Sequence, residues 1–301
     1  KPKVDGPQSA IVTGPAGEEI FCDEHGRVRV KFHWDRYHGM TEASSCWVRV
    51  SQAWAGPGFG NLAIPRIGQE VIVDFLNGDP DQPIIMGRTY HEDNRSPGSL
   101  PGTKTQMTIR SKTYKGSGFN ELRFEDATGG EQVYIHAQKN MDTEVLNNRT
   151  TDVKVDHTET IGNNQSITVG LGQTVTVGKE NAGGHDQTVT VTHDQNVSVG
   201  NDQSLTVTNN RSKSVGNDQD SKVTGNDTEA VDKSQSVTVG ETLTVTVGDS
   251  IEFVCGKSTL RMDKDGYITI NGHELSLGTT GDQFYKADGD MNMKGKKILE
   301  N

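Results

Sequence analysis

From Thr143 to Phe253 the chain repeats every eight residues, and this period limits the possible folds more than any other feature. One position of the repeat is aliphatic throughout, and we call it the inward column. Its members are Val145, Val153, Ile161, Val169, Val177, Val191, Val199, Val207, Val215, Val223, Val231, Val239 and Val247. Between Val177 and Val191 the spacing is one octad plus six residues, Lys179–Gly184. We expect these six to form a surface loop that leaves the register unchanged.

An octad whose apolar residues lie two apart is typical of a short strand followed by a turn. Residues 141–250 contain no Phe, Tyr, Trp, Pro or Cys. A segment with so little apolar volume cannot close a globular core within one chain. The sequence therefore predicts a stacked β-structure that buries its inward column against other copies of the chain.

A companion column lies two residues before the inward column in each octad. It reads Thr143, Thr151, Glu159, Ile167, Val175, Val189, Val197, Leu205, Lys213, Ser221, Glu229, Val237, Val245 and Phe253. Six of these fourteen are polar, and three of them, Lys213, Ser221 and Glu229, are consecutive in the column; we expect that part of the core to hold ordered water or ions. Cys255 follows Val247 by eight residues, so three thiols are expected to meet at the axis.

The chain divides into four parts by composition. Residues 1–90 alternate in short runs separated by Gly/Pro turns, which favours a small closed barrel of the OB type. Its strands are expected at 26–32, 46–50, 70–75 and 83–88, with all three Trp in its core. Residues 91–140 are a linker and transition strands, with strands at 120–126 and 131–137. Residues 141–255 carry the octads, and residues 256–301 continue them with a looser period.

Charge and cysteine usage exclude several classes of protein. The net charge is −11, and between Met141 and Ser250 there are 16 acidic but only 7 basic residues, which argues against a nucleic-acid partner. No run of about 18 apolar residues predicts a membrane span, and none resembles a signal peptide. The three separated cysteines favour a reduced compartment, the cytoplasm. Because the first residue is Lys1, we interpret the chain as a fragment or processed product.

No motif for catalysis is present: the sequence lacks HExxH, GxSxG, a Walker loop and a dinucleotide-binding GxGxxG. We predict no enzyme, no cofactor and no metal. His33 and His38 leave a metal site as a minor alternative to a polar loop. Asp263–Gly266 resembles half of a calcium loop but lacks the acidic residue at the twelfth position, so a hairpin turn is the favoured interpretation.

Several long motifs resemble the valine-glycine repeat protein G (VgrG) family, over essentially the whole chain. They are Gly17–Ile20, Asp23–Asp35, Trp47–Gln52, Ile64–Val71, Gly78–Pro83, Asn120–Asp126 and Ile135–Gln138. The resemblance implies the trimeric spike of the bacterial type VI secretion system. It implies an all-β fold, with an N-terminal OB-fold barrel followed by a trimeric intertwined triple-stranded β-helix needle. The large base that precedes the barrel in the family is missing from this sequence.

The resemblance also implies partners and a location. The partners are two further copies of the chain, the tube protein (Hcp) through the missing base, a PAAR tip at the C-terminal end, a secreted effector and, transiently, the target membrane. The spike would assemble in the bacterial cytoplasm and then be injected. Two alternatives are a trimeric phage-tail-like spike or fibre that binds surface glycans, and an adhesin. The glycan-binding alternative would require paired carboxylates beside exposed aromatic rings, and the octads contain no aromatic residue.

Overall fold

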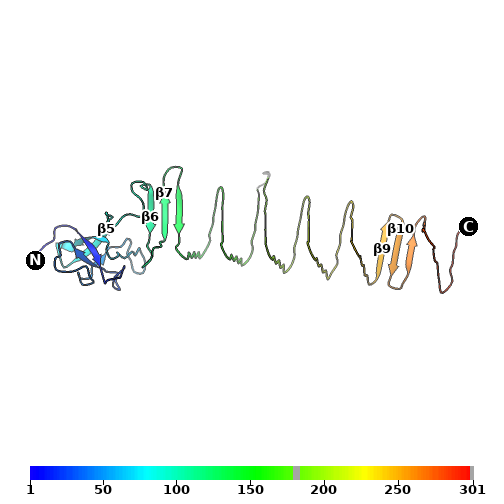
Figure 1. The fold of residues 1–301 in the computed structure, drawn as a ribbon, viewed down its shortest axis with the longest axis horizontal. Helices are drawn as coiled ribbons and strands as arrows, with labels where there is room; N and C mark the ends of the chain where they lie inside the picture. Colours follow the sequence, from blue (N-terminus) through cyan, green and yellow to red (C-terminus); the bar gives the residue numbers. More distant parts are fainter. Residues whose placement is uncertain (179–183, 299–301) are drawn as a thin grey trace. The chain divides into compact units, whose positions relative to one another are not determined.

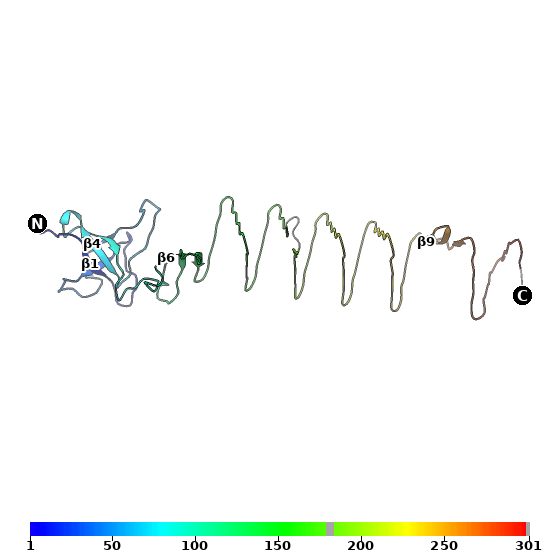
Figure 2. The same ribbon diagram turned by 90° about the horizontal axis from the view of Figure 1, so that it is seen from above.

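The computed structural model describes residues 1–178 and 184–298, and divides the chain into two compact units, Lys1–Gln173 and Thr174–Asn301. Both are built from β-strands and extended segments (Figures 1 and 2). Within the described ranges there is no α-helix, only the 3-10 turn η1 (Leu76–Gly78). The strands are β1 (Gln8–Thr13), β2 (Arg29–Phe32), β3 (Arg49–Val50), β4 (Glu70–Phe75), β5 (Pro83–Arg88), β6 (Gln106–Arg110), β7 (Glu121–Glu125), β8 (Gln132–His136), β9 (Ser250–Cys255), β10 (Ser258–Asp263) and β11 (Ile268–Asn271).

The first five strands form a small barrel. Their order in the sheet is β2-β1-β4-β5-β3, with β3 and β5 parallel and the other pairs antiparallel. A two-way backbone hydrogen bond between Val28 and Val48 links the β2 side to the β3 side (3.0 and 2.8 Å). The cyclic order β1-β2-β3-β5-β4 is that of the five-stranded Greek-key OB-fold. The predicted fold of this region is confirmed, and β1 is a strand that the sequence interpretation missed.

Alternation of side chains explains the barrel core. In β4, Val71, Val73 and Phe75 point inward while the residues between them remain half-buried. The core consists of Ala10, Val12, Val28, Val30, Val48, Val71, Val73, Phe75 and Ile85. β-branched valines suit so narrow an interior, because their stiff side chains pack well on a pleated surface.

The prediction that the three Trp fill this core is wrong. Trp34 and Trp54 are 64% and 81% exposed, and Trp47 is only half-buried. The valines already occupy the interior, so the larger rings lie outside it. Trp34 stacks on Phe32 with 5.1 Å between ring centroids, and its indole N–H donates to Gln8.

Strands β6, β7 and β8 form a three-stranded antiparallel meander after the barrel. The predicted strands at 120–126 and 131–137 correspond to β7 and β8, while β6 was not foreseen. It begins directly after the turn that contains Pro101 and Gly102, at the end of the region that was interpreted as a linker.

The octads are visible in the backbone as regularly spaced bends. Two-residue bends begin at residue 146 and recur at 154, 162 and 170, then every eight residues from 192 to 248. Each bend immediately follows a member of the inward column, with six extended residues between bends. The expected register is therefore present on both sides of Lys179–Gly184, of which residues 179–183 lie outside the described ranges. The four domain boundaries remain a prediction.

After Cys255 the backbone keeps most of the octad bends, although the bend expected at 272 lies at 273. Turns at 256–257 and 264–265 and bends at 280–281 and 288–289 lie at multiples of eight from the bend at 248. Strands β9, β10 and β11 pair as an antiparallel meander within the chain. The predicted hairpin at Asp263–Gly266 is confirmed, since the Asp263 carboxylate accepts hydrogen bonds from the backbone N–H groups of Asp265 and Tyr267.

Candidate functional site

The inward column is uncovered in one chain. Every described residue from 138 to 250 is exposed, and this includes the column itself. Its members are exposed by between 45% and 53%, whereas the apolar members of the companion column are exposed by between 60% and 69%. The narrow range follows from the repeated backbone, which covers each inward side chain by nearly the same amount. Thirteen aliphatic side chains left half exposed at equivalent positions indicate an interaction site.

The backbone of the octads also lacks partners within the chain. Among the described residues from 138 to 248, no N–H group donates to a backbone carbonyl of the same chain, and no strand is formed. Extended backbone in this state presents unpaired N–H and C=O groups, which bind other strands readily. The octads therefore offer two kinds of binding group together, a hydrophobic column and open hydrogen-bonding edges.

A three-stranded sheet with one apolar face lies on each side of this stretch. In β6–β7–β8 the cross-strand rows are Met107–Phe124–Val133 and Ile109–Leu122–Ile135. The opposite face carries the polar residues of the alternation, including Arg110, Arg123 and His136. Met107, Ile109, Val133 and Ile135 are all more than half exposed. The sheet β9–β10–β11 has the same arrangement. The sequence interpretation missed both faces, because they arise only when the strands are paired in register.

A polar junction attaches the barrel to the loop between β6 and β7. The Glu18 carboxylate accepts hydrogen bonds from the Tyr114 hydroxyl and from Lys115 Nζ (3.0 Å). Glu19 accepts from the Lys115 backbone N–H (3.1 Å) and pairs with Arg66 (3.2 Å). Arg66 also donates to the Lys112 carbonyl. The contacts of Glu18 and Glu19 with Tyr114 and Lys115 join residues nearly one hundred positions apart and hold the barrel against the loop between β6 and β7.

The junction should make barrel stability depend on acid pH. The hydrogen bond from Tyr114, followed by that from Lys115, lowers the pKa of Glu18 below its ordinary value. A carboxyl group with a lowered folded-state pKa stabilises the fold above its unfolded pKa of about 4.3, and this contribution disappears as pH falls through the folded value. We expect Glu18→Gln to lower the unfolding temperature slightly at pH 7. The difference between the variant and the parent, measured by circular dichroism, should be smaller at pH 3 than at pH 7. A difference of equal size at both pH values would contradict this assignment.

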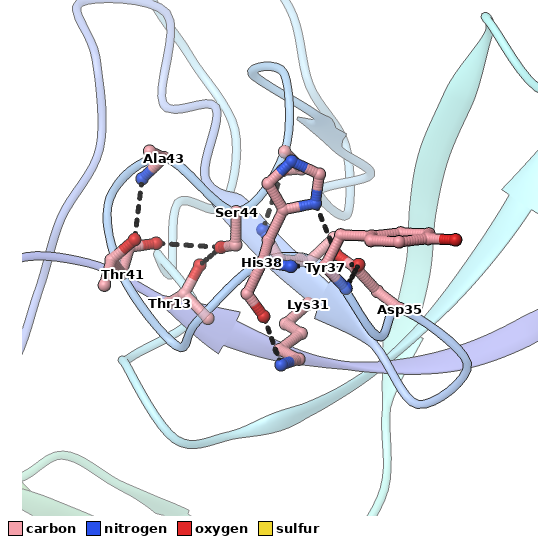
Figure 3. Close-up of polar contacts among 10 residues, drawn as sticks. Thr13, Lys31, Asp35, Tyr37, His38, Thr41, Ala43 and Ser44 are labelled. Atoms are coloured by element: carbon pink, nitrogen blue, oxygen red, sulfur yellow. Dashed lines mark hydrogen bonds and ion pairs between the residues drawn. The ribbon is translucent and has the colours of Figure 1, made fainter.

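The loop after β2 is held by its own hydrogen bonds (Figure 3). The Asp35 carboxylate accepts from the backbone N–H groups of Tyr37 and His38 and lies 2.9 Å from His38 Nδ1. These bonds, that of Tyr37 first, lower the pKa of Asp35. Ser44 contacts the buried Thr13 hydroxyl at 2.5 Å. His38 is therefore paired with Asp35, and within the described ranges no three His, Cys, Asp or Glu side chains are arranged to hold a metal ion.

All thirteen inward residues lie at equivalent positions directly before a bend. That they face a common axis remains a prediction. Cys255 is exposed at the end of β9, where it pairs with Ser258. Lys213 and Glu229 are exposed as well, and Glu229 accepts a hydrogen bond from Gln235 Nε2 (3.0 Å). The described part of the chain contains no helix that could cross a membrane.

Two protein families match this chain. Residues 107–184 and 182–262 match the bacteriophage T4 gp5 C-terminal trimerisation domain. Residues 21–90 match the type VI secretion system/phage-baseplate injector OB domain. The first match covers the octads together with strands β6 to β9 and most of β10, and the second covers most of the barrel. The all-β class, the OB barrel and the trimeric needle type predicted from the sequence are confirmed by these matches.

The regions that match curated relatives cover between 50% and 53% of this chain. The "Actin cross-linking toxin VgrG1" of Vibrio cholerae is 62% identical over 154 residues, which are 51% of this chain and 14% of the relative. The "Type VI secretion system spike protein VgrG3" of the same species is 57% identical over 156 residues, 52% of this chain and 15% of the relative. The spike protein VgrG1b of Pseudomonas aeruginosa is 56% identical over 162 residues, 53% and 22% respectively. The matched part thus spans less than a quarter of the length of these relatives.

Proposed function

Because the chain belongs to the VgrG (valine-glycine repeat protein G) family, we propose that three copies of it form the shaft of a type VI secretion spike. In this spike the octads of three chains wind round one axis. The inward column meets at that axis, and each open backbone edge pairs with another chain. The chain acts as a rigid mechanical part and not as an enzyme.

The observation that carries this proposal is the joint exposure of the inward column and of the octad backbone. Either feature alone would destabilise an isolated chain, since neither the valines nor the peptide groups are satisfied. Winding three chains together satisfies both at once and leaves no lateral edge open to further chains. Burial of each Val contributes about 1.5–3 kcal/mol, so the stability of the shaft accumulates layer by layer.

The shaft suits penetration because its outside is polar and its inside is closed. The acidic balance of the octads keeps the shaft soluble, and such a surface does not bind nucleic acid. We propose that the base implied for the full-length protein docks on the tube protein Hcp. A PAAR-type protein caps the C-terminal end, a secreted effector is carried, and the target membrane is contacted transiently. Assembly would take place in the bacterial cytoplasm before injection.

The molar mass in solution tests the proposal. Light scattering should give three times the chain mass of 32.7 kDa. Unboiled samples should migrate as a trimer on a denaturing gel, because unfolding requires three interwoven chains to separate and is therefore slow. Boiled samples serve as the monomer control.

A monomer in solution, with no trimer band before boiling, would rule out the spike. If light scattering shows a trimer that dissociates in detergent without heating, the proposed oligomeric state stands but the interwoven arrangement is contradicted.

A further inference from the structure

The sheet β9–β10–β11 interrupts the pattern of the octads. Its apolar face consists of two cross-strand rows, Phe253–Leu260–Ile270 and Ile251–Met262–Ile268. The opposite face carries Glu252, Val254, Thr259, Arg261, Thr269 and Asn271. The sheet is thus one-sided, as sheets are when one face is buried.

This apolar face has no cover within the chain. Phe253, Ile270 and Ile268 are 61%, 56% and 69% exposed. A hollow of about 450 Å³ opens beside Phe253, Leu260 and Ile270. On these three adjoining strands Phe253, Met262, Ile268 and Ile270 are exposed while Ile251 and Leu260 are half-buried, and a soluble protein seldom leaves such an apolar face uncovered.

The spacing of the apolar residues changes after Phe253, where the chain begins to form hydrogen bonds with itself. In the octads every member of the inward and companion columns has an odd number, up to Phe253. In β10 and β11 the apolar residues have even numbers, as in Leu260, Met262 and Ile268. This change of parity is what a tight hairpin requires, because Cys255 pairs directly with Ser258 and the faces then alternate from that pair. Gly256 makes the turn possible with a positive φ of 57°. At 250–271 the backbone hydrogen bonds are therefore made within each chain.

The octads alone do not define how three chains align. Sliding one chain by eight residues places every inward Val opposite another Val, so hydrophobic burial hardly changes. A weakly specified register of this kind allows slipped assemblies. A segment that does not repeat is needed to distinguish the correct alignment.

We propose that the β9–β10–β11 sheets of three copies pack through their apolar faces and lock the register of the shaft. The proposal rests on the trimer proposed above. Three one-sided sheets facing one another form a closed prism, in which side chains meet across the axis while hydrogen bonds remain within each chain. Only the aligned register brings all three sheets to the same level.

Two observations favour other copies of this chain as the occupant of the face. The trimerisation-domain match continues to residue 262 and so includes β9 and nearly all of β10. The sheet β6–β7–β8, at the other end of the same match, presents two apolar rows in the same arrangement. The octads are thus flanked on both sides by non-repeating, one-sided sheets.

The test uses two neighbouring substitutions in β11. Ile268→Asp places a carboxylate on the apolar face, and Thr269→Asp places the same charge on the opposite face. Both are made in a chain with Cys22→Ser, Cys46→Ser, Cys255→Ala and a single spin label at Asn201→Cys, an exposed bend residue. Distances between labels are measured by pulsed electron paramagnetic resonance, and mass by light scattering. Three aligned chains give one label distance, and a slip by one octad moves a label by about 4.8 Å along the axis.

We expect Ile268→Asp to give several distances or loss of the detergent-resistant trimer, while Thr269→Asp retains a single distance. Ile268→Ala should change the distances in the same direction but less. If both Asp variants match the parent, or if both are impaired equally, the register lock is refuted. A partner of another kind on this face would leave the trimer of Ile268→Asp unchanged, which also refutes it. A monomeric parent would instead refute the trimer itself.

Discussion

Val207→Asp should abolish assembly of the trimer. Val207 lies in the middle of the inward column and is equivalent in the backbone to its twelve fellow members. In the proposed shaft the substitution brings three carboxylates together at one level of the axis. Each loses about 1.5–3 kcal/mol of apolar burial, and the buried charges have no partner, which costs several kcal/mol more per ion. Light scattering should detect monomers or aggregates where the parent forms trimers.

Thr206→Asp is the matched control for this prediction. Thr206 is the adjacent residue of the same extended segment, so its side chain points to the other face. The control introduces the same charge and should assemble like the parent. Normal assembly of Val207→Asp, or equal failure of both variants, would show that the inward column has been assigned to the wrong register.

Replacing Lys213 and Glu229 together by Val should stabilise the shaft. Both belong to the companion column, which borders the axis, and Ser221 lies between them in that column. In the proposed trimer this part of the core must retain water or ions, because the ammonium and carboxylate groups require solvation. Replacing buried ionic groups by apolar residues of suitable volume often stabilises a protein by about 1–4 kcal/mol. The temperature at which the trimer dissociates in detergent should therefore rise.

The control removes one negative and one positive charge from the outer face, by combining Asp220→Val with Lys222→Val. These residues flank Ser221 in one extended segment, and their loss should leave the dissociation temperature nearly unchanged. A lower dissociation temperature for the Lys213 and Glu229 variant would contradict the wet core. A trimer structure with both side chains fully in solvent around a dry axis would contradict it as well.

The period of the chain could be predicted because it depends on neighbours in sequence. Val145 and its equivalents fix one bend per octad, and the Asp263–Gly266 turn follows from its own carboxylate. The contacts that were missed depend on the folded chain. Glu18 meets Tyr114 only after the barrel has closed, and β1 has few strand-forming residues apart from Ile11 and Val12. The Trp residues were predicted to be buried because large aromatic rings commonly fill a core. In this barrel the smaller valines already fill it.

The contrast between barrel and octads also sets the order of events after synthesis. The barrel completes its core and its hydrogen bonds within one chain, so it can fold while the remainder is still being made. The octads cannot follow until two more chains arrive. Their folding rate therefore depends on chain concentration with an order above one, and dilution slows shaft formation more than proportionately. Chains released together from neighbouring ribosomes would assemble into trimers before their exposed valines bound other molecules.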